Sequence, residues 1–332
     1  MNDLRLTIGI PTLGARPDRL QKAIGAALGQ SIPARVLVSL QGDNPAATDA
    51  IEPFLTHPLV RLVRSPASCL WENWTHAAEM CDTEIFAWLQ DDDILSPHFA
   101  RRVLAALDRH PRAVAWIARL GISFTDGASL WWQATGPMVP MDLISGGLTE
   151  IDGLLLAAGS FFSSFALSPG VAFRVTPETI AAVNRVPKDS DLFAERTVLA
   201  ELGTLGAVVC DPAIVGYWCQ HETNESRRQV LAGESIRQFE RMCEAIDPIL
   251  AARPDWTQAL HGWSCIVGRE VCDRWLADTD RFLPGTDALR TARDVVSGAA
   301  GRTHSQAEES RPVETAVAKK PRRAERAVKA RA

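Results

Sequence analysis

Residues 85–97 read IFAWLQDDDILSP, and this stretch decides the fold. The five apolar residues at 85–89 predict a short strand that is buried on both faces. Three carboxylates follow at residues 91–93. Ser96 and Pro97 then predict the start of a helix, because a capping residue stands directly before a proline at the first helical position. A buried strand that leads through a polar loop into a helix indicates an α/β fold.

The residues upstream repeat this alternation of strand and helix. Short apolar runs predict strands at 6–10, 36–40 and 59–63, the first of which ends at Pro11. Between the first two strands, apolar residues with helical spacing follow Asp18, which can cap a helix. We therefore expect a mainly parallel sheet covered on both faces, with ligands at the carboxyl ends of its strands.

Downstream of residue 113 the alternation is less regular. A strand is predicted at 171–175, and a helix at 192–202 that stops at Gly203. Residues 207–218 hold two closing strands. From residue 228 to 300 only helical periodicity remains. These patterns predict a catalytic domain over residues 1–226 and a helical appendage over residues 227–300.

The charge is distributed unevenly along the chain. The formal net charge is -5. Residues 301–332 carry nine Lys or Arg and four Asp or Glu, which leaves -10 on the other 300 residues. An acidic body argues against nucleic acid as the main partner, because binding phosphates needs clustered cations. We expect the tail, residues 301–332, to be disordered and basic, and to be a candidate for peripheral contact with an anionic membrane surface.

Three features bear on the compartment. The seven cysteines include no C-x-x-C pair, which favours reduced thiols in a cytosolic protein. The N-terminal residues do not have the pattern of a signal peptide. The charge-free stretch 153–173 contains serines, glycines and Pro169, which favours a buried stretch beside an active site over a membrane span. We expect a cytoplasmic protein, with the tail as its only contact with the inner face of a membrane.

The run of three carboxylates is the strongest chemical signal. Adjacent negative charges are costly unless a cation neutralises them. A hard divalent ion such as Mn²⁺ or Mg²⁺ suits oxygen ligands and usually also binds substrate phosphates. The alternative is a solvated acidic turn that caps the next helix, and the position after a buried strand argues against it.

Seven stretches, taken in order, resemble glycosyltransferase family 2. They are TIGIPTLGARPDRLQKAIGAALGQS at 7–31, VLVSLQGDN at 36–44, NWTHAAEM at 73–80, EIFAWLQDDDILSP at 84–97, GVAFR at 170–174, KDSDLFAER at 188–196 and GYWCQHETNES at 216–226. The resemblance covers about residues 5–226. It implies the GT-A fold, a nucleotide-sugar donor and transfer with inversion.

The resemblance also implies donor-binding residues after the first two strands. Pro11 and Thr12 match the segment that lines the nucleotide, and Arg16 follows them. Gln41 or Asp43 lies where many members read the base with an aspartate. This chain has a different sequence at that point, so the contact with the base and the identity of the nucleotide stay open.

The roles of the three carboxylates follow by the same comparison. When residues are counted back from Pro97, Asp92 falls on the metal-ligand position. Asp91 would face the ribose or the sugar, and Asp93 would support the metal site. Gln90 stands where many members have the first aspartate, so the division of roles stays open.

Asn73 and His221 each allow two interpretations. Asn73 follows the third strand and either reaches the donor or only caps or packs. His221 lies in an H-x-x-N-x-S pattern like that of the family, and it either approaches the metal or a phosphate or orders its loop by hydrogen bonds.

The resemblance places the catalytic base near residue 190. Inverting transfer needs a carboxylate that takes the proton of the acceptor hydroxyl. Asp189 matches the family's position, and Asp191 is the alternative. An aspartate at a helix start is also a common N-cap, so one of the pair is expected only to cap.

These observations predict a metal-dependent glycosyltransferase that acts on a glycan, a lipid-linked or a small-molecule acceptor. A nucleotidyltransferase acting on sugar phosphates is a rival, but the residues after Pro11 are not rich enough in glycine and basic residues for its phosphate loop. The second rival is a catalytically inactive binding protein. Asp92 and Asp189 together argue against it.

Overall fold

The first hundred residues alternate strands and helices as the sequence predicts. The computed structural model describes residues 4–124, 147–162, 168–189, 191–224, 228–229, 232–253 and 255–267. The first elements are β1 (Leu6–Thr12), α1 (Pro17–Leu28), β2 (Arg35–Gln41), α2 (Pro45–Ile51), the 3₁₀ turn η1 (Glu52–Phe54), β3 (Val60–Ser65), α3 (Leu70–Glu79) and β4 (Ile85–Trp88). The four predicted strands are confirmed.

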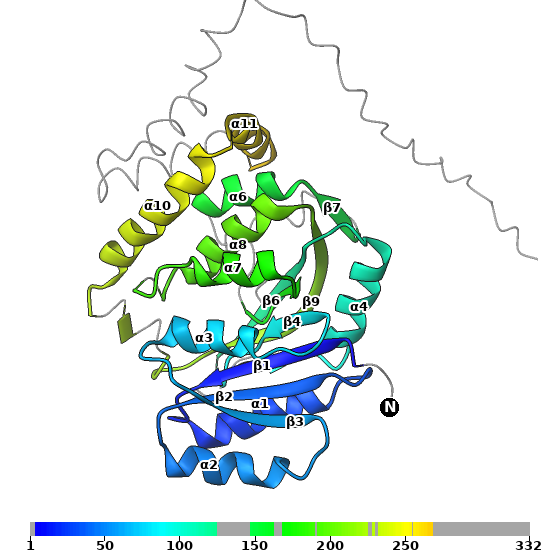
Figure 1. The fold of residues 1–332 in the computed structure, drawn as a ribbon, viewed down its shortest axis with the longest axis vertical. Coiled ribbons are helices and arrows are strands. Elements are labelled where there is room, and N and C mark those ends of the chain that lie inside the picture. The colour runs from blue at the N-terminus through cyan, green and yellow to red at the C-terminus, as the bar shows by residue number, and fades with distance from the viewer. Residues whose placement is uncertain are drawn as a thin grey trace, which may run out of the picture.

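The remaining elements close the sheet and add further helices to both of its faces (Figure 1). They are β5 (Ile94–Leu95), α4 (Phe99–Arg109), β6 (Ala115–Phe124), β7 (Thr149–Ile151), α6 (Gly153–Phe162), β8 (Val171–Arg174), α7 (Pro177–Asn184), α8 (Ala194–Leu205), β9 (Val208–Gln220), α10 (Ser235–Ala251) and α11 (Trp256–Val267). The two closing strands predicted within residues 207–218 form one strand, β9.

The described strands form a single mixed sheet in the order β3-β2-β1-β4-β8-β6-β9-β5, and β7 pairs with β9. β3, β2, β1 and β4 are parallel neighbours. β8 is antiparallel to both β4 and β6. The parallel part of the sheet is therefore formed by the N-terminal part of the chain. Its last strand is β4, which leads into the loop with the three aspartates, called the acidic loop below.

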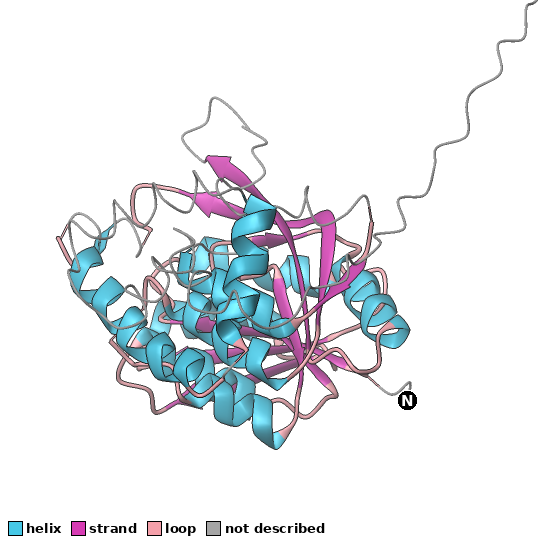
Figure 2. Cartoon of the chain, turned by 90° about the horizontal axis from the view of Figure 1, so that it is seen from above, coloured by secondary structure: helices cyan, strands magenta, loops and turns pink. Residues whose placement is uncertain are grey.

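Successive side chains of the strands enter two different cores, one on each face of the sheet. In β4, Ile85 and Ala87 pack with α1 and α4. Phe86 and Trp88 point the other way and pack with α3 and α7. This period-two pattern is what a strand buried on both faces requires. Figure 2 shows the helices on both sides of the strands.

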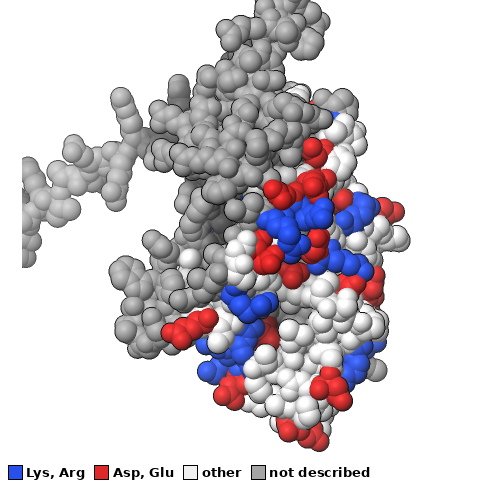
Figure 3. Space-filling view, turned by 90° about the vertical axis from the view of Figure 1, so that its left-hand side faces the viewer, with Lys and Arg blue, Asp and Glu red and all other residues white. Residues whose placement is uncertain are grey.

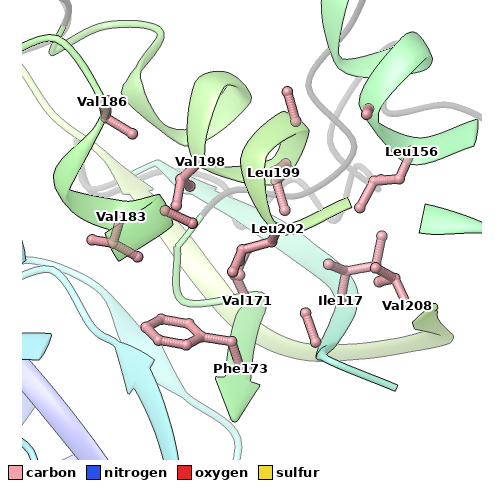
Figure 4. Close-up of a cluster of buried hydrophobic side chains, with 14 of the residues drawn as sticks. Ile117, Leu156, Val171, Phe173, Val183, Val186, Val198, Leu199, Leu202 and Val208 are labelled. Atoms are coloured by element: carbon pink, nitrogen blue, oxygen red, sulfur yellow. The ribbon is translucent and has the colours of Figure 1, made fainter. Parts of the chain in front are cut away.

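The second core lies between the sheet and α6, α7 and α8 (Figure 4). Two glycines let α6 and α8 approach closely. A Cβ atom at Gly153 would lie 1.9 Å from the Gly206 carbonyl oxygen, and one at Gly203 would lie 2.3 Å from the Gly153 carbonyl oxygen. Gly203 therefore serves helix packing. The prediction that it ends the helix is wrong, because α8 runs on to Leu205.

The charge-free stretch 153–173 forms part of this core. Its described residues lie in α6 and around β8, and Leu156, Ala157 and Phe173 are fully buried. Within the described ranges, no helix is long and apolar enough to cross a membrane.

The helices of the predicted appendage share the second core. Met242, Cys243 and Ile246 of α10 and Leu260 and Trp263 of α11 belong to the same buried cluster as α6 and α8. The boundary at residue 226 is thus a change of element type, and apolar packing continues across it. The predicted tail, residues 301–332, lies outside the described residues.

Candidate active site

The three aspartates lie in the loop between β4 and β5, at the carboxyl end of β4. β1 is the parallel neighbour of β4, with Gly9 opposite Trp88. Parallel neighbours end at the same edge of a sheet, so the loop after β4 meets the loop after β1. Thr12 and Arg16 are the residues of the β1 loop that contact it.

Asp91 is buried and held from two sides. Thr12 Oγ1 donates to its Oδ2 at 2.5 Å, and Arg16 Nη2 donates to its Oδ1 at 2.8 Å. The Gly14 amide donates in turn to Thr12 Oγ1 at 2.8 Å, which requires the left-handed backbone of Gly14, with φ of 69°. Burial raises the pKa of Asp91, and the Arg16 guanidinium opposes this effect.

Asp92 contacts three other side chains of the site. Its Oδ2 lies 2.7 Å from Arg16 Nη1 and 2.8 Å from His221 Nε2, and it accepts from Asn224 Nδ2 at 3.4 Å. Arg16 therefore bridges Asp91 and Asp92. The side chains of Asp92 and His221 are only 9% and 5% exposed. Burial lowers the pKa of His221, although the hydrogen bond to Asp92 opposes this effect, so the neutral imidazole is favoured.

Asp93 joins the loop to β9. Its Oδ1 accepts from the Cys219 amide at 2.8 Å. Its Oδ2 is buried and has no hydrogen-bond partner among the described residues. Burial, and next the charge of Asp92, raise the pKa of Asp93 well above its usual value. A buried carboxylate oxygen without a partner is costly, which makes Asp93 a group that a bound cation or donor would stabilise.

A divalent ion would have few protein ligands here. In the described part of the chain, no group of three or more His, Cys, Asp or Glu side chains is arranged to hold a metal ion by itself. Asp92 and His221 offer an oxygen and a nitrogen that already lie side by side. Mg²⁺ and Mn²⁺ sites with one or two protein carboxylates use substrate phosphates and water for the remaining positions, so the donor set fits such an ion.

The comparison with protein families decides the class. The model of the family described as glycosyl transferase family 2 matches residues 7–152, which include Thr12, Arg16 and all three aspartates. This match assigns residues 7–152 to glycosyltransferase family 2. This match confirms the resemblance seen in the sequence.

A solved mannosyltransferase structure supports the fold, and a second solved structure is also similar. The mannosyltransferase PcManGT from Pyrobaculum calidifontis, in complex with GDP-Man and Mn²⁺, is 14% identical with a TM-score of 0.52, over 92% of this chain and 82% of that chain. Residues 1–349 of TarS from S. aureus, in complex with UDP-GlcNAc, are 13% identical with a TM-score of 0.49, over 90% of this chain and 92% of that chain. The glycosyltransferase has the GT-A fold. No curated protein matches the chain.

The other donor-binding candidates of the glycosyltransferase domain lie in different surroundings. Pro11 is buried in β1 opposite Ser39. Gln41 ends β2, and its Oε1 is buried with no hydrogen-bond partner within the described residues. The side chain of Asp43 is 98% exposed and lies 3.9 Å from Arg64. Gln41 therefore has the surroundings of a binding residue, whereas Asp43 is free to move.

Asn73 has the surroundings of a packing residue. It is fully buried and accepts from Ser39 Oγ at 2.7 Å. Its Nδ2 donates to the carbonyl oxygens of Ser39 at 3.1 Å and Thr12 at 3.3 Å. Asn73 thus ties the ends of β1 and β2 together, and these contacts favour packing over direct contact with a donor.

Among the described residues, Asp189 contacts helix α10 and Asp191 lies near the start of α3. Asp189 is 48% exposed and pairs with Arg241 at 3.2 Å and Arg237 at 3.4 Å. It lines a surface groove of about 960 Å³ between α7, α8 and α10. Figure 3 views the side on which α10 lies and shows Lys and Arg intermingled with Asp and Glu. Asp191 is half-buried before α8, and its charge adds to burial in raising the pKa of Cys69.

Sequence reasoning missed Asn224. Its Oδ1 accepts from the His221 amide at 2.5 Å, and its Nδ2 donates to the Cys219 carbonyl at 3.1 Å as well as to Asp92. Asn224 therefore fixes the loop that carries His221 against Asp92. The H-x-x-N spacing around His221 is the signal that points to it.

Proposed function

We propose that the protein transfers a sugar from a nucleoside diphosphate sugar to an acceptor hydroxyl, with a divalent cation and with inversion at the sugar carbon. The observation that carries the proposal is the convergence of Arg16, Asp91, Asp92 and His221 at the carboxyl ends of parallel strands in a family 2 glycosyltransferase domain.

The cation would be Mn²⁺ or Mg²⁺, held by Asp92 and His221 and supported by Asp93. When bound, it would stabilise the negative charge that develops on the departing diphosphate. The unpartnered Oδ2 of Asp93 and the neutral His221 support this assignment. The mannosyltransferase with the similar fold was solved with GDP-Man and Mn²⁺, which also supports it.

The donor would lie along the ends of β1 and β2. Pro11 and Thr12 would line the nucleotide, and Gln41 or Asp43 would read the base. Arg16 carries a guanidinium that matches the geometry of phosphate oxygens, and it is only partly exposed, at 24%. We propose that it contacts the diphosphate, while Asp91 faces the ribose or the sugar.

The acceptor would be a glycan, a lipid-linked or a small molecule. The basic tail, residues 301–332, would hold the protein at an anionic membrane surface, with about 1 kcal/mol from each basic residue near that surface. Flotation with anionic liposomes tests this part. We expect the full chain to float and a chain that ends at residue 300 to stay in the protein fractions, and equal behaviour of the two would refute it.

A thermal-shift screen tests the proposed function. The ligands are UDP-N-acetylglucosamine, GDP-mannose, UDP and GDP, each with and without Mn²⁺. A ligand at 100 times its Kd stabilises the native state by about 2.7 kcal/mol, which is several degrees in Tm. We expect at least one nucleotide to raise Tm only when Mn²⁺ is present. No shift with any of them would refute the donor class.

The products separate this proposal from its rivals. A glycosyltransferase releases a nucleoside diphosphate from the sugar nucleotide. A nucleotidyltransferase forms pyrophosphate from a sugar phosphate and a nucleoside triphosphate. An inactive binding protein shows the thermal shift and forms neither product. We expect the first outcome.

A further inference from the structure

Glu195 is a carboxylate that the proposed site does not use. It is the second residue of α8 and is half-buried. The Ser168 amide donates to its Oε1 at 2.6 Å, which fixes the orientation of the carboxylate. In the described part of the chain, its Oε2 has no hydrogen-bond partner.

The surroundings of Ser168 place Glu195 beside the acidic loop. Ser168 precedes Pro169, which packs on Gly216 of β9. A Cβ atom built at Gly216 would lie 3.2 Å from Pro169 Cγ and 2.7 Å from the carbonyl oxygen of Ile94. Ile94 directly follows Asp93. The turn that holds Glu195 and the end of the acidic loop therefore both pack against Gly216 of β9.

Electrostatics agree with this placement. The charge of Glu195 is among the causes, after burial and Asp92, that raise the pKa of Asp93. Asp93 therefore lies within electrostatic range of Glu195. Asp189, in the described part of the chain, pairs instead with Arg237 and Arg241 on α10.

We propose that Glu195, held by Ser168, is the general base that accepts the proton of the acceptor hydroxyl. This inference rests on the proposed function, and it gives Glu195 the role of base that the sequence analysis expected at Asp189. The acceptor oxygen forms the new bond to the anomeric carbon while the bond from that carbon to the diphosphate oxygen breaks. The hydroxyl proton moves to Glu195, and the electron pair of the broken bond leaves with the nucleoside diphosphate. Glu195 later releases its proton to solvent.

The protonation behaviour of Glu195 suits this role. Burial raises its pKa to about 7, and the hydrogen bond from the Ser168 amide opposes the rise. A base whose pKa lies near the working pH is about half ionised and is basic enough to take a proton in the transition state.

The test uses water as the acceptor, because slow hydrolysis of a nucleotide sugar needs the same proton removal. Release of nucleoside diphosphate from UDP-N-acetylglucosamine or GDP-mannose is measured for the full chain, E195Q, E195D and D189N. E178Q is the matched control, because Glu178 is also the second residue of its helix, α7, and is exposed.

We expect E195Q to lower kcat by about 100-fold or more, the usual scale of general-base catalysis, with a nucleotide Kd within about threefold of wild type. E195D should restore part of kcat, since it keeps the carboxylate. D189N and E178Q should keep most of it. Wild-type kcat in E195Q, or loss of kcat in D189N alone, would overturn the proposal.

The readouts keep the two claims separate. Nucleoside diphosphate release by the wild-type chain tests the proposed function, and the ratio of E195Q to wild type tests Glu195. If E195Q does not fold, E195D decides between the outcomes. A wild-type kcat that rises with pH through about 7, and a changed profile in folded E195D, support the proposal, and identical profiles refute it.

Discussion

Asp92 and Asp189 both belong to acidic clusters that stand before a helix, yet their surroundings differ. Asp92 is 9% exposed and contacts Arg16, His221 and Asn224, which come from both ends of the domain. Asp189 is 48% exposed and contacts two arginines of α10. The difference shows that a carboxylate becomes part of a site when a sheet brings other elements to it. Proximity to a helix start is not sufficient.

The two acidic clusters also differ in what they contribute to the stability of the folded protein. A surface pair such as Asp189 with Arg241 is screened by solvent and contributes little to stability. Asp91 and Asp93 of the acidic loop are buried and have raised pKa values, and Asp93 Oδ2 has no hydrogen-bond partner among the described residues. A bound cation or ligand would therefore stabilise this loop. The following predictions test this contrast.

Removal of the divalent ion should have the largest effect. Exhaustive chelation with EDTA should slow nucleoside diphosphate release by about 1000-fold, or about 4 kcal/mol, because the charge of the departing diphosphate is no longer stabilised. Added Mn²⁺ should restore the rate. The measurement is the release rate before and after chelation. An unchanged rate in EDTA would show that the acidic loop does not act through a metal.

Loss of the Arg16 guanidinium, which bridges Asp91 and Asp92, should have the second largest effect. R16Q leaves Asp91 and Asp92 without their shared guanidinium, and we expect it to lower the free energy of unfolding by about 3 kcal/mol. R64Q is the control, since the pair of Arg64 with Asp43 is exposed. Urea unfolding of both variants gives the two values. Mn²⁺ should stabilise R16Q more than wild type. Equal losses in R16Q and R64Q would contradict the account.

The E195Q variant should be more stable than wild type at high pH. The pKa of Glu195 is about 7 when folded and close to its model value of 4.5 when unfolded. The folded chain thus binds the extra proton between these values, so wild-type stability falls as pH rises from 4.5 to 7 and is lowest above 7.

Glutamine has no such loss, so E195Q should gain about 2 kcal/mol at pH 8 and less than half of that at pH 5. Urea unfolding at the two pH values gives the difference. The same gain at both values would show that ionisation of Glu195 is not its source. This readout does not depend on activity.

The smallest effect is expected at Asp189. D189N removes exposed ion pairs, so it should cost less than about 1 kcal/mol in stability, and it should change kcat by less than about twofold. Urea unfolding and the release assay give the two numbers. A 100-fold loss of kcat would return the role of base to Asp189.

The sequence predicted the parallel half of the sheet, and it placed most residues of the candidate site at one edge of that sheet. The apolar runs locate β1 to β4, and the rule that ligands bind at the carboxyl ends of parallel strands brings Thr12 and Arg16 to the loop after β4. The H-x-x-N pattern adds His221. These predictions rely on the spacing of apolar residues and on the order of the elements along the chain. Both can be read from a single sequence.

The surroundings of Asp189 and of the proposed base, Glu195, could not be predicted in the same way. Asp189 meets arginines that come from α10, far along the chain, and Glu195 depends on a turn at Ser168 that packs on Gly216. Such contacts are set by tertiary packing, and no local pattern records them. The helix after Asp191 was also predicted too short, because the role of Gly203 in packing on Gly153 is not visible in the sequence.

Calorimetric titration of the chain with UDP and with GDP in the presence of Mn²⁺ tests the central claim most directly, with D92N and D189N compared to wild type. The claim is that the donor diphosphate and its cation bind at the acidic loop after β4. We predict that D92N weakens binding of the nucleotide that wild type binds by at least about 30-fold, or about 2 kcal/mol, because a metal ligand is lost. D189N should bind within about twofold of wild type. Binding by D92N that equals wild type, with binding lost in D189N, would contradict the claim.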